Sequence, residues 1–498
     1  MNKCLPNIRR QTLKTITGKL KKGVTRADKK VPIWISPRTF VLFVGVTAAA
    51  SLGTPGNIIG TVAMAAGNVT VHSSRRYLQD AAGKPKFLAG HYDWASVDPN
   101  SFIDQPSRYT DMINIGTPYK INYIRISLGV NRFTVSTNPQ SWNGQPTPTA
   151  FRYVANKADL DQWDPKFWAG LRYHCDLARQ KGMVVHIALF DGVGLRGGSL
   201  QYRWRGSYWN IDNQTRNFFG DLDKDNDGSA DENGDFYRLS DFNNNMGVGK
   251  YQRKLIDKAT AETSQYENVF YEVGNELFGG PADWHTAVVN YVKTKTSKAV
   301  TQNQGSRATN IDGWSQHKAG TPSAVKNNVA AIVGKGYPAW EDPDGPSLQS
   351  GTPDDLRHAS WYSFVGGAAG WGGFTLDFWN EILNTATLSY YQHLATFIEN
   401  SGVKFWEMVP QHSLVSNSSE NSVLAKAGSE YVVYVLDDAT VTLNLSAVSG
   451  NTTACAYDPQ AGKWGSVTTV PGGGTRTFTR PAGTNDWVLY VKVGCASH

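Results

Sequence analysis

Short apolar runs alternate with longer amphipathic stretches between about residue 80 and residue 385. The apolar runs have the length of buried strands, and the stretches between them have helical spacing. This alternation is typical of a parallel sheet covered by helices. The predicted strands are Lys86–His91, Ile121–Ser127, Met183–Leu189, Val269–Val273, Ala299–Gln302, Thr309–Gly313, Tyr337–Glu341 and Ala368–Thr375. The predicted helices include Phe167–Gln180, Ala282–Lys298, Pro322–Val333 and Asp354–Phe364. Eight such units predict an α/β fold, a closed (β/α)8 or TIM barrel, whose functional groups gather at the carboxyl ends of the strands.

The pattern changes after a predicted helix at Leu388–Asn400. From about Ser413 the chain shows short alternating strands separated by turns rich in Gly and Asn. The predicted strands are Tyr431–Leu436, Val441–Leu445 and Trp487–Val493. Strands of this kind favour an antiparallel β-sandwich. We therefore expect a barrel over residues 66–410 and a C-terminal sandwich over residues 411–498.

The N-terminal segment, residues 1–65, carries the charge of an export signal. Residues 1–38 hold eleven of the 49 Lys and Arg but one of the 42 Asp and Glu, and residues 39–65 hold no charge. Removing this segment turns the formal net charge of +7 into about −3, because 38 basic and 41 acidic residues remain. The remaining chain therefore shows no basic stripe for nucleic acid. A basic region before an apolar run predicts a secreted, cell-surface or periplasmic protein, with an uncleaved membrane anchor as the alternative to a cleaved signal peptide.

A long insertion at about residues 192–247 follows the third predicted strand and is rich in Trp, Tyr, Asn and Asp. It contains acidic residues at alternate positions followed by Gly228, which is the spacing of a calcium loop. Position twelve counted from the first ligand is Gly234, so the pattern is not that of a standard EF-hand. We expect a structural Ca²⁺ ion whose ligands are Asp223, Asp225, Asp227 and Asp231.

The four cysteines are too few for a disulfide scaffold. Cys455 and Cys495 both lie in the predicted sandwich and could pair after export. The sequence also lacks the His-Glu-x-x-His and Gly-x-Ser-x-Gly motifs of two protease classes.

The strongest chemical signal is the run VFYEVGNE, which ends at Glu276 before a Gly-Gly-Pro turn and a helix. In a barrel this places Asn275 and Glu276 at the active rim. A carboxylic acid there can protonate the leaving oxygen of a glycoside, and an amide can hold a sugar hydroxyl. The segment resembles the fourth strand of clan A glycoside hydrolases. The resemblance implies that Asn275 contacts the substrate and Glu276 is the acid/base.

The same clan needs a second carboxylate at the end of the seventh strand, about 5 Å from the first in a retaining enzyme. The matching stretch holds three acids, and here the sequence departs from the usual pattern of the clan. Glu341 is our candidate nucleophile because the short strand should end there. Asp342 and Asp344 remain close alternatives.

Further rim candidates come from the other strand ends. Arg125 matches the strand-two arginine of the clan, which keeps the nucleophile ionised, and needs a carboxylate partner in any case. Glu272 lies four residues before the acid/base and is interpreted as a deeper, structural residue. The remaining candidate substrate contacts, which could equally be packed residues, are His91, Trp94, His317 and, as a platform resembling that of the clan, Trp371.

The wider chain is similar to family 5-like and apiosidase-like hydrolases, whose tail is often a small sandwich of the collagen-binding type. The resemblance implies a retaining glycoside hydrolase that acts on a polysaccharide or oligosaccharide without a catalytic cofactor, and we expect a monomer. A catalytically silent carbohydrate-binding or adhesion protein on the same scaffold is the alternative. A calcium-organised envelope protein is a second one. The sugar, the linkage, and endo or exo attack stay open.

Overall fold

The barrel predicted from the sequence is confirmed. A computed structural model of the chain describes residues 67–91, 108–128, 149–155, 157–196, 207–210, 214–215, 234–318, 321–342, 352–372 and 385–492. Eight parallel strands close into a barrel in chain order, because the last strand pairs with the first. The strands are β4 (Leu88–His91), β5 (Tyr123–Ser127), β8 (Val184–Asp191), β9 (Val269–Asn275), β10 (Val300–Asn303), β11 (Gly313–Gln316), β12 (Ala339–Glu341) and β13 (Gly370–Trp371).

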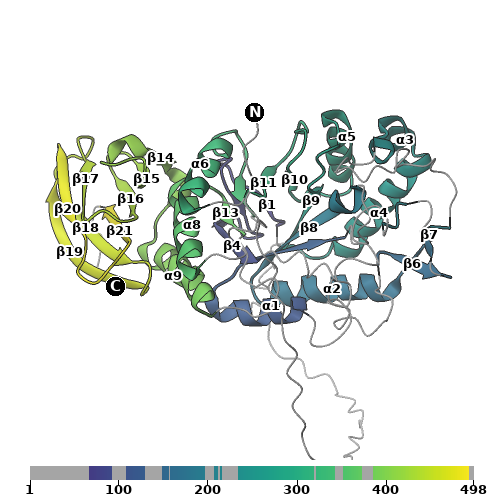
Figure 1. Ribbon diagram of the computed structural model, residues 1–498, viewed down its shortest axis with the longest axis horizontal. Coiled ribbons are helices and arrows are strands. Elements are labelled where there is room, and N and C mark those ends of the chain that lie inside the picture. The colour runs from purple at the N-terminus through teal and green to yellow at the C-terminus, as the bar shows by residue number, and fades with distance from the viewer. Residues whose placement is uncertain are drawn as a thin grey trace, which may run out of the picture. The chain divides into compact units, whose positions relative to one another are not determined.

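Helices lie on the outside of this barrel (Figure 1). They are α1 (Arg108–Gly116), α2 (Pro165–Gln180), α3 (Leu239–Asn244), α4 (Gly247–Thr263), α5 (Ala282–Lys293), α6 (Pro322–Ile332), α8 (Pro353–Val365) and α9 (Thr385–Ser401). Two short antiparallel sheets accompany the barrel, β1 (Thr70–Val71) with β2 (Leu78–Gln79) and β3 (Pro85–Lys86), and β6 (Phe151–Val154) with β7 (Lys157–Trp163).

The sixth strand lies later than the sequence predicted. We expected Thr309–Gly313, but β11 begins at Gly313. Asn310 has a positive φ of 64°, which belongs to a turn rather than a strand. The carboxylate of Asp312 then accepts a 2.9 Å hydrogen bond from the backbone N–H of Val300, at the start of β10. Residues 309–312 therefore form the connection that leads into β11.

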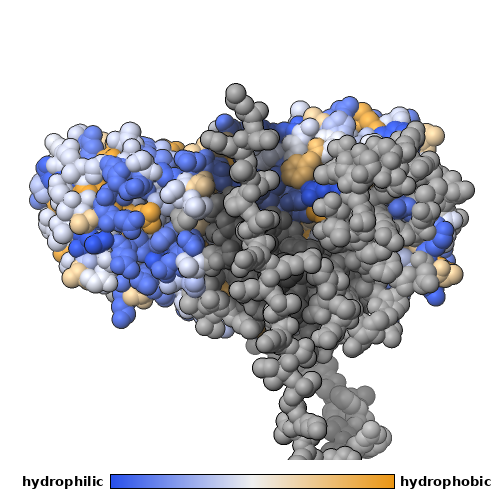
Figure 2. Space-filling model, in the orientation of Figure 1, coloured by the Kyte–Doolittle hydropathy of each residue, from blue (hydrophilic) through white to orange (hydrophobic). Residues whose placement is uncertain are grey.

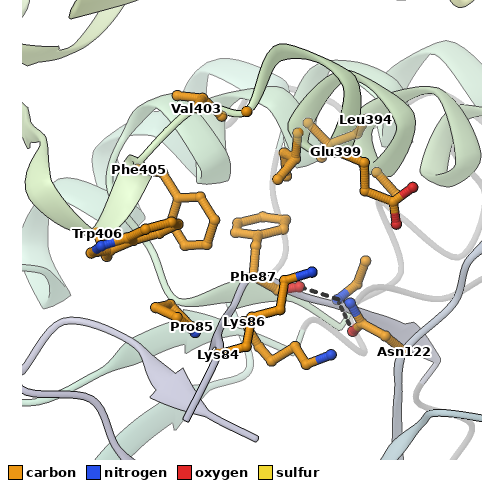
Figure 3. A pocket seen from close by; sticks show the side chains of 14 residues that line it. Lys84, Pro85, Lys86, Phe87, Asn122, Leu394, Glu399, Val403, Phe405 and Trp406 are labelled. Atoms are coloured by element: carbon orange, nitrogen blue, oxygen red, sulfur yellow. Dashed lines mark hydrogen bonds between the residues drawn. The ribbon is translucent and has the colours of Figure 1, made fainter. Parts of the chain in front are cut away.

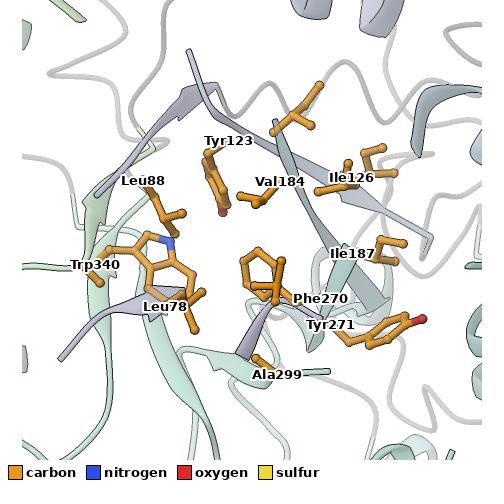
Figure 4. Packing of buried hydrophobic residues seen from close by; sticks show 14 of the residues in the cluster. Leu78, Leu88, Tyr123, Ile126, Val184, Ile187, Phe270, Tyr271, Ala299 and Trp340 are labelled. Carbon is orange, nitrogen blue, oxygen red and sulfur yellow. The ribbon is translucent and has the colours of Figure 1, made fainter. Parts of the chain in front are cut away.

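Aromatic side chains pack in the interior of the barrel. Tyr123, Phe270 and Trp340 point into the interior from β5, β9 and β12 (Figure 4). The imidazole of His186 stacks on Phe270 with ring centroids 4.3 Å apart. Because alternate residues of a strand face opposite sides, these inward residues fix which later positions of each strand also face the interior.

The C-terminal strands form two antiparallel sheets, as predicted. Six strands run in the order β14-β15-β16-β21-β18-β19, and two form the pair β17-β20. Their bounds are β14 (Val409–Pro410), β15 (Ser422–Lys426), β16 (Glu430–Val435), β17 (Thr440–Asn444), β18 (Asn451–Asp458), β19 (Lys463–Pro471), β20 (Thr475–Thr479) and β21 (Trp487–Lys492). In Figure 2 the described surface of this region is largely hydrophilic, with scattered hydrophobic residues.

The central strand β16 is apolar on both of its faces, and both faces are covered. Val433 and Val435 pack with β17 in a core of the sandwich's own. Tyr434, on the opposite face, stacks on Trp361 of α8 with ring centroids 6.0 Å apart and belongs to the same core as the barrel. The larger sheet is therefore packed between the smaller sheet and the barrel helices.

A buried ion pair accompanies this contact. The guanidinium of Arg357, on α8, donates to the carboxylate of Asp486 at 2.8 Å and 3.1 Å, and both side chains are almost fully buried. Arg357 also pairs with Asp354 on its own helix. Asp486 accepts a further 2.9 Å hydrogen bond from the hydroxyl of Tyr434. Since each polar group has a partner, the ion pair can remain buried.

Several predictions fall on residues outside the described ranges. These are the N-terminal leader, most of the insertion with its calcium loop, and Cys495. Cys455 is disulfide-bonded, although its partner is not among the described residues. Within the described part of the chain, no helix has both the length and the apolar character needed to cross a membrane.

Replacing Asp486 with Ala should lower the free energy of unfolding by about 3 kcal/mol, because the buried Arg357 loses its buried carboxylate partner and keeps only the half-exposed carboxylate of Asp354. Denaturant unfolding monitored by tryptophan fluorescence measures this loss. The matched control is Glu407→Ala, which removes the partner of Lys426 in an exposed ion pair. The control should leave the unfolding midpoint unchanged. If Asp486→Ala lowers the free energy of unfolding no more than Glu407→Ala does, the buried ion pair does not stabilise the fold.

Candidate active site

Glu276 lies at the carboxyl end of β9, where a barrel carries its functional groups. Its φ angle is 49°, in the left-handed region that a non-glycine residue adopts at a cost of about 1 kcal/mol or more. The backbone N–H of Glu276 donates to Asn303 Oδ1 at 3.1 Å, while the next residue, Leu277, is fully buried. The strained turn therefore sends Leu277 into the core and keeps Glu276 at the rim.

Two basic side chains contact the carboxylate of Glu276. Arg196 Nη2 donates to Glu276 Oε2 at 2.7 Å, and His317 Nδ1 lies 3.3 Å from Glu276 Oε1. Burial raises the pKa of Glu276, but the hydrogen bonds and positive charges of His317 and Arg196 outweigh burial and hold the pKa at about 2. Glu276 is therefore ionised at neutral pH in the free protein.

Arg125 forms a fully buried ion pair with Glu272 inside the barrel. Its Nε lies 3.3 Å from Glu272 Oε2, and its Nη2 donates to both Glu272 Oε1 and Asn275 Oδ1, the latter at 3.2 Å. Glu272 Oε2 also accepts a 3.1 Å hydrogen bond from the hydroxyl of Ser315 and lies 3.3 Å from His186 Nε2. The carboxylate partner expected for Arg125 is thus Glu272, directly below the rim.

The structure does not bring Glu341 to this interior. In β12 the indole of Trp340 points into the barrel, so Glu341, the next residue, faces the outer layer. Its carboxylate accepts a hydrogen bond from Gln316, whose Nε2 also lies 3.4 Å from the carbonyl oxygen of Asn328 on α6. Burial raises the pKa of Glu341 to about 8. We chose Glu341 as nucleophile because the strand ends there, but its side chain lies on the wrong face of that strand.

Asp342, one of the two alternatives to Glu341, faces the barrel interior. Its Oδ2 accepts hydrogen bonds from the hydroxyl of Tyr123 at 3.0 Å and from Trp340 Nε1 at 2.9 Å. Burial raises the pKa of Asp342 to about 6, although the positive charges of Arg125 and His317 lower it. The carboxyl group thus lies in the interior, within electrostatic reach of the same His317 that contacts Glu276.

One oxygen of Asp342, Oδ1, is buried and has no hydrogen-bond partner among the described residues. A buried polar atom without a partner costs about 1–3 kcal/mol and calls for an explanation. Gly372, which follows the neighbouring strand β13, lies against this oxygen, since a Cβ added there would come within 1.8 Å of Oδ1. Only a residue without a side chain leaves room for this carboxylate.

The remaining predicted site residues have different outcomes. His317 does lie at the rim, in contact with Glu276. Trp371 pairs in register with Glu341 and is fully buried, so it offers no open platform for a sugar. The predicted residues whose side chains fall outside the described ranges are His91, Trp94, Asp344, Asp223, Asp225, Asp227 and Asp231. Among the described residues, no cluster of three or more His, Cys, Asp or Glu side chains could hold a metal ion.

Two residues at the rim were missed by the sequence analysis. Asp191 ends β8, and Asn275 Nδ2 donates to its Oδ1 at 3.0 Å. Asp191 Oδ2 also accepts a 3.1 Å hydrogen bond from the backbone N–H of Gly194, in the short turn that leads to Arg196. The place of Asp191 after the third apolar run could have revealed it. Nothing in the sequence singles out Arg196.

A cavity of about 240 Å³ lies elsewhere, at the amino ends of the barrel strands. It opens between the segment before β4 and helix α9 (Figure 3), and its lining includes Lys84, Phe87, Asn122, Leu394, Phe405 and Trp406. The side-chain amide of Asn122 accepts a hydrogen bond from the backbone N–H of Ala89 and donates one to the carbonyl oxygen of Phe87. This cavity is separate from the group of charged residues around Glu276.

Solved structures with the same fold include glycoside hydrolases. One, titled "Glycoside hydrolase", aligns over 86% of this chain and 98% of its own with a TM-score of 0.61 and 14% identity. A glycoside hydrolase family 5 structure from Bacteroides vulgatus aligns over 86% of this chain and 93% of its own, with a TM-score of 0.60 and 14% identity. At this identity the likeness establishes a shared fold.

A family model matches the C-terminal part of the chain. Residues 409–492 match the family described as "Putative collagen-binding domain of a collagenase". No curated protein shows significant sequence similarity to the chain. The chain therefore has a barrel-and-sandwich fold that is also found in glycoside hydrolases, and its sandwich is the part that matches the family model.

Proposed function

We propose that the protein is a retaining glycoside hydrolase in which Glu276 is the acid/base and Asp342 the nucleophile. The observation that carries the proposal is a pair of carboxyl groups at the carboxyl ends of β9 and β12. Glu276 is partly buried and contacts His317, and Asp342 is fully buried and interacts electrostatically with the same histidine. Two carboxyl groups on either side of a scissile bond are what glycoside hydrolysis requires. The shared fold with glycoside hydrolases supports this assignment.

In the first step the carboxylate of Asp342 attacks the anomeric carbon while the bond to the leaving oxygen breaks. Protonated Glu276 donates its proton to that oxygen. In the second step water attacks the glycosyl–enzyme ester, and the Glu276 carboxylate accepts the proton of that water. The sugar leaves with its original anomeric configuration, and both carboxyl groups return to their starting states.

The charge states of the two groups fit these roles unequally. A pKa of about 6 leaves Asp342 ionised at pH 7, as a nucleophile must be. Glu276 is ionised as well, because Arg196 and His317 hold its proton affinity low. It must therefore gain a proton when the substrate binds, which requires the contacts of its carboxylate to change.

The same ion pairs favour one alternative. A carboxylate held by Arg196 and His317 could serve only to bind a sugar, as in a catalytically silent carbohydrate-binding protein. Such a protein would retain glycan binding and release no product.

Incubating the purified chain with plant, microbial and bacterial-envelope polysaccharides should generate new reducing ends. Glu276→Gln should lower this activity by at least about 10³-fold, since it removes both the acid and the base. Added azide should restore turnover of a substrate with a good leaving group, because azide attacks the glycosyl–enzyme without a base. Equal activity of Glu276→Gln and the wild type would contradict the assignment, and glycan binding without hydrolysis would favour the silent protein.

Asp342→Asn and Glu341→Gln should separate the two neighbouring acids. The first should abolish hydrolysis, whereas the second should leave kcat close to that of the wild type because Glu341 faces away from the site.

Glu341→Gln should change stability instead. The folded protein keeps the Glu341 proton to about pH 8, while the unfolded chain loses it near 4.5, so wild-type stability falls as pH rises between these values. Thermal unfolding from pH 4 to pH 9 should show a smaller fall in the variant. Loss of activity in Glu341→Gln at full stability would favour Glu341 as nucleophile.

A further inference from the structure

An exposed aromatic ring lies two residues beyond the proposed acid/base. Phe278 is 49% exposed, although Leu277 before it is fully buried. The backbone N–H of Phe278 donates to the carbonyl oxygen of Glu276 at 2.8 Å, which closes a tight turn at the rim. The turn therefore presents Glu276 and Phe278 next to each other, on either side of a residue that anchors them to the core.

Arg196 joins the ring to the carboxylate. Its guanidinium carbon lies 5.2 Å from the centroid of the Phe278 ring, and its Nη2 donates to Glu276 Oε2 at 2.7 Å. The Arg196 side chain is 19% exposed and that of Glu276 is 12% exposed. A guanidinium, an aromatic face and a carboxylate thus form one continuous surface that solvent reaches.

The chemistry of the proposed reaction determines what meets this surface. The acid/base must lie within hydrogen-bonding distance of the leaving oxygen, so the group beyond that oxygen lies on the Glu276 side of the cleft. The nucleophile contacts the opposite side of the sugar that is being transferred. Residues that flank Glu276 and face solvent are therefore placed to contact the leaving group.

We propose that Phe278 and Arg196 form the binding site for the leaving group, and that this group is itself a sugar. The inference rests on the proposed hydrolase function and narrows its substrate class to bonds between two sugars. The apolar face of a sugar ring packs on the exposed face of Phe278. Its hydroxyl groups accept hydrogen bonds from the guanidinium of Arg196. A small leaving group makes neither contact.

This arrangement also explains how Glu276 becomes an acid. When the hydroxyl groups of the leaving sugar engage Arg196, the guanidinium no longer donates to Glu276 Oε2. Loss of that hydrogen bond raises the pKa of Glu276, because the hydrogen bond had stabilised the ionised form. The correct leaving group therefore prepares the proton that its own departure needs.

The test compares two substrates of the same sugar, an oligosaccharide and the glycosyl fluoride. The fluoride leaving group is too small to reach Phe278. We expect Phe278→Ala to lower kcat/KM for the oligosaccharide about tenfold and to leave the value for the fluoride unchanged. The matched control is Tyr173→Ala, which removes a 44% exposed aromatic side chain of α2 and should change neither value. Equal losses on both substrates, or none on either, would overturn the proposal.

Arg196→Gln provides a second readout that a structural role would not change. Without the guanidinium the pKa of Glu276 in the free enzyme rises. Because the pKa of Glu276 is the lower of the two and that of Asp342 the higher, the acid limb of the pH profile of kcat/KM should move to higher pH. An unchanged limb would show that Arg196 does not act on Glu276.

Failure of the hydrolase proposal can be told apart from failure of this one. Glu276→Gln protein, with and without Phe278→Ala, is applied to the same polysaccharides immobilised on an array. If the wild type hydrolyses nothing but Phe278→Ala weakens binding, the sugar-binding surface stands without the hydrolase. If Phe278→Ala leaves binding unaltered, or if no glycan binds, the leaving-group site is wrong.

Discussion

The buried ion pair between Arg125 and Glu272 is the interaction on which the rest of the site depends. Placing two charges inside a barrel costs several kcal/mol per ion unless every polar atom finds a partner. Glu272 meets this condition through Arg125 and the Ser315 hydroxyl, and Ser315 in turn accepts a 3.0 Å hydrogen bond from Asn303 Nδ2. Asn303 then accepts the backbone N–H of Glu276. A chain of hydrogen bonds therefore runs from the centre of the barrel to the strained turn at its rim.

Burial and charge act in opposite directions on the two carboxyl groups above this layer. Both are taken out of water, which raises the pKa of each. Glu276 contacts the basic side chains of Arg196 and His317 directly. Asp342 accepts hydrogen bonds from neutral donors and interacts with Arg125 and His317 only electrostatically. The result is a large difference in proton affinity between two acids at one rim. Part of that difference comes from the hydrogen bond of Arg196 to Glu276, and a bound substrate can replace this hydrogen bond.

The fold could be predicted largely because strand periodicity is local. The barrel and the sandwich follow from short strand-forming runs and their spacing. In β16, for example, the continuous apolar run reflects a strand that is covered on both of its faces. The error in the sixth strand has a local cause as well. Asp312 lies inside the segment expected as a strand, but its carboxylate accepts a hydrogen bond from the first residue of β10.

The site was harder to predict because it depends on which face of a strand each residue occupies. Glu341 and Asp342 differ by one position, and in a strand one position changes the side that the residue faces. Trp340 points into the barrel, so the next residue faces outward and the one after it faces inward, but the sequence does not show which way Trp340 points. Arg196 gave no signal at all, because an arginine in a loop acquires a partner only when the chain folds. Trp371 was misjudged since its identity suggests a platform, whereas its register places it in the core.

The central claim is that Asp342 forms the covalent intermediate, and trapping that intermediate tests it most directly. A 2-deoxy-2-fluoro glycosyl fluoride of the sugar that the enzyme releases should form the ester and hydrolyse it slowly, because fluorine at C2 destabilises both positively charged transition states. Proteolysis and mass spectrometry then locate the added mass. The account predicts one glycosyl group on Asp342. A label on Glu341 or on Glu276 would contradict it.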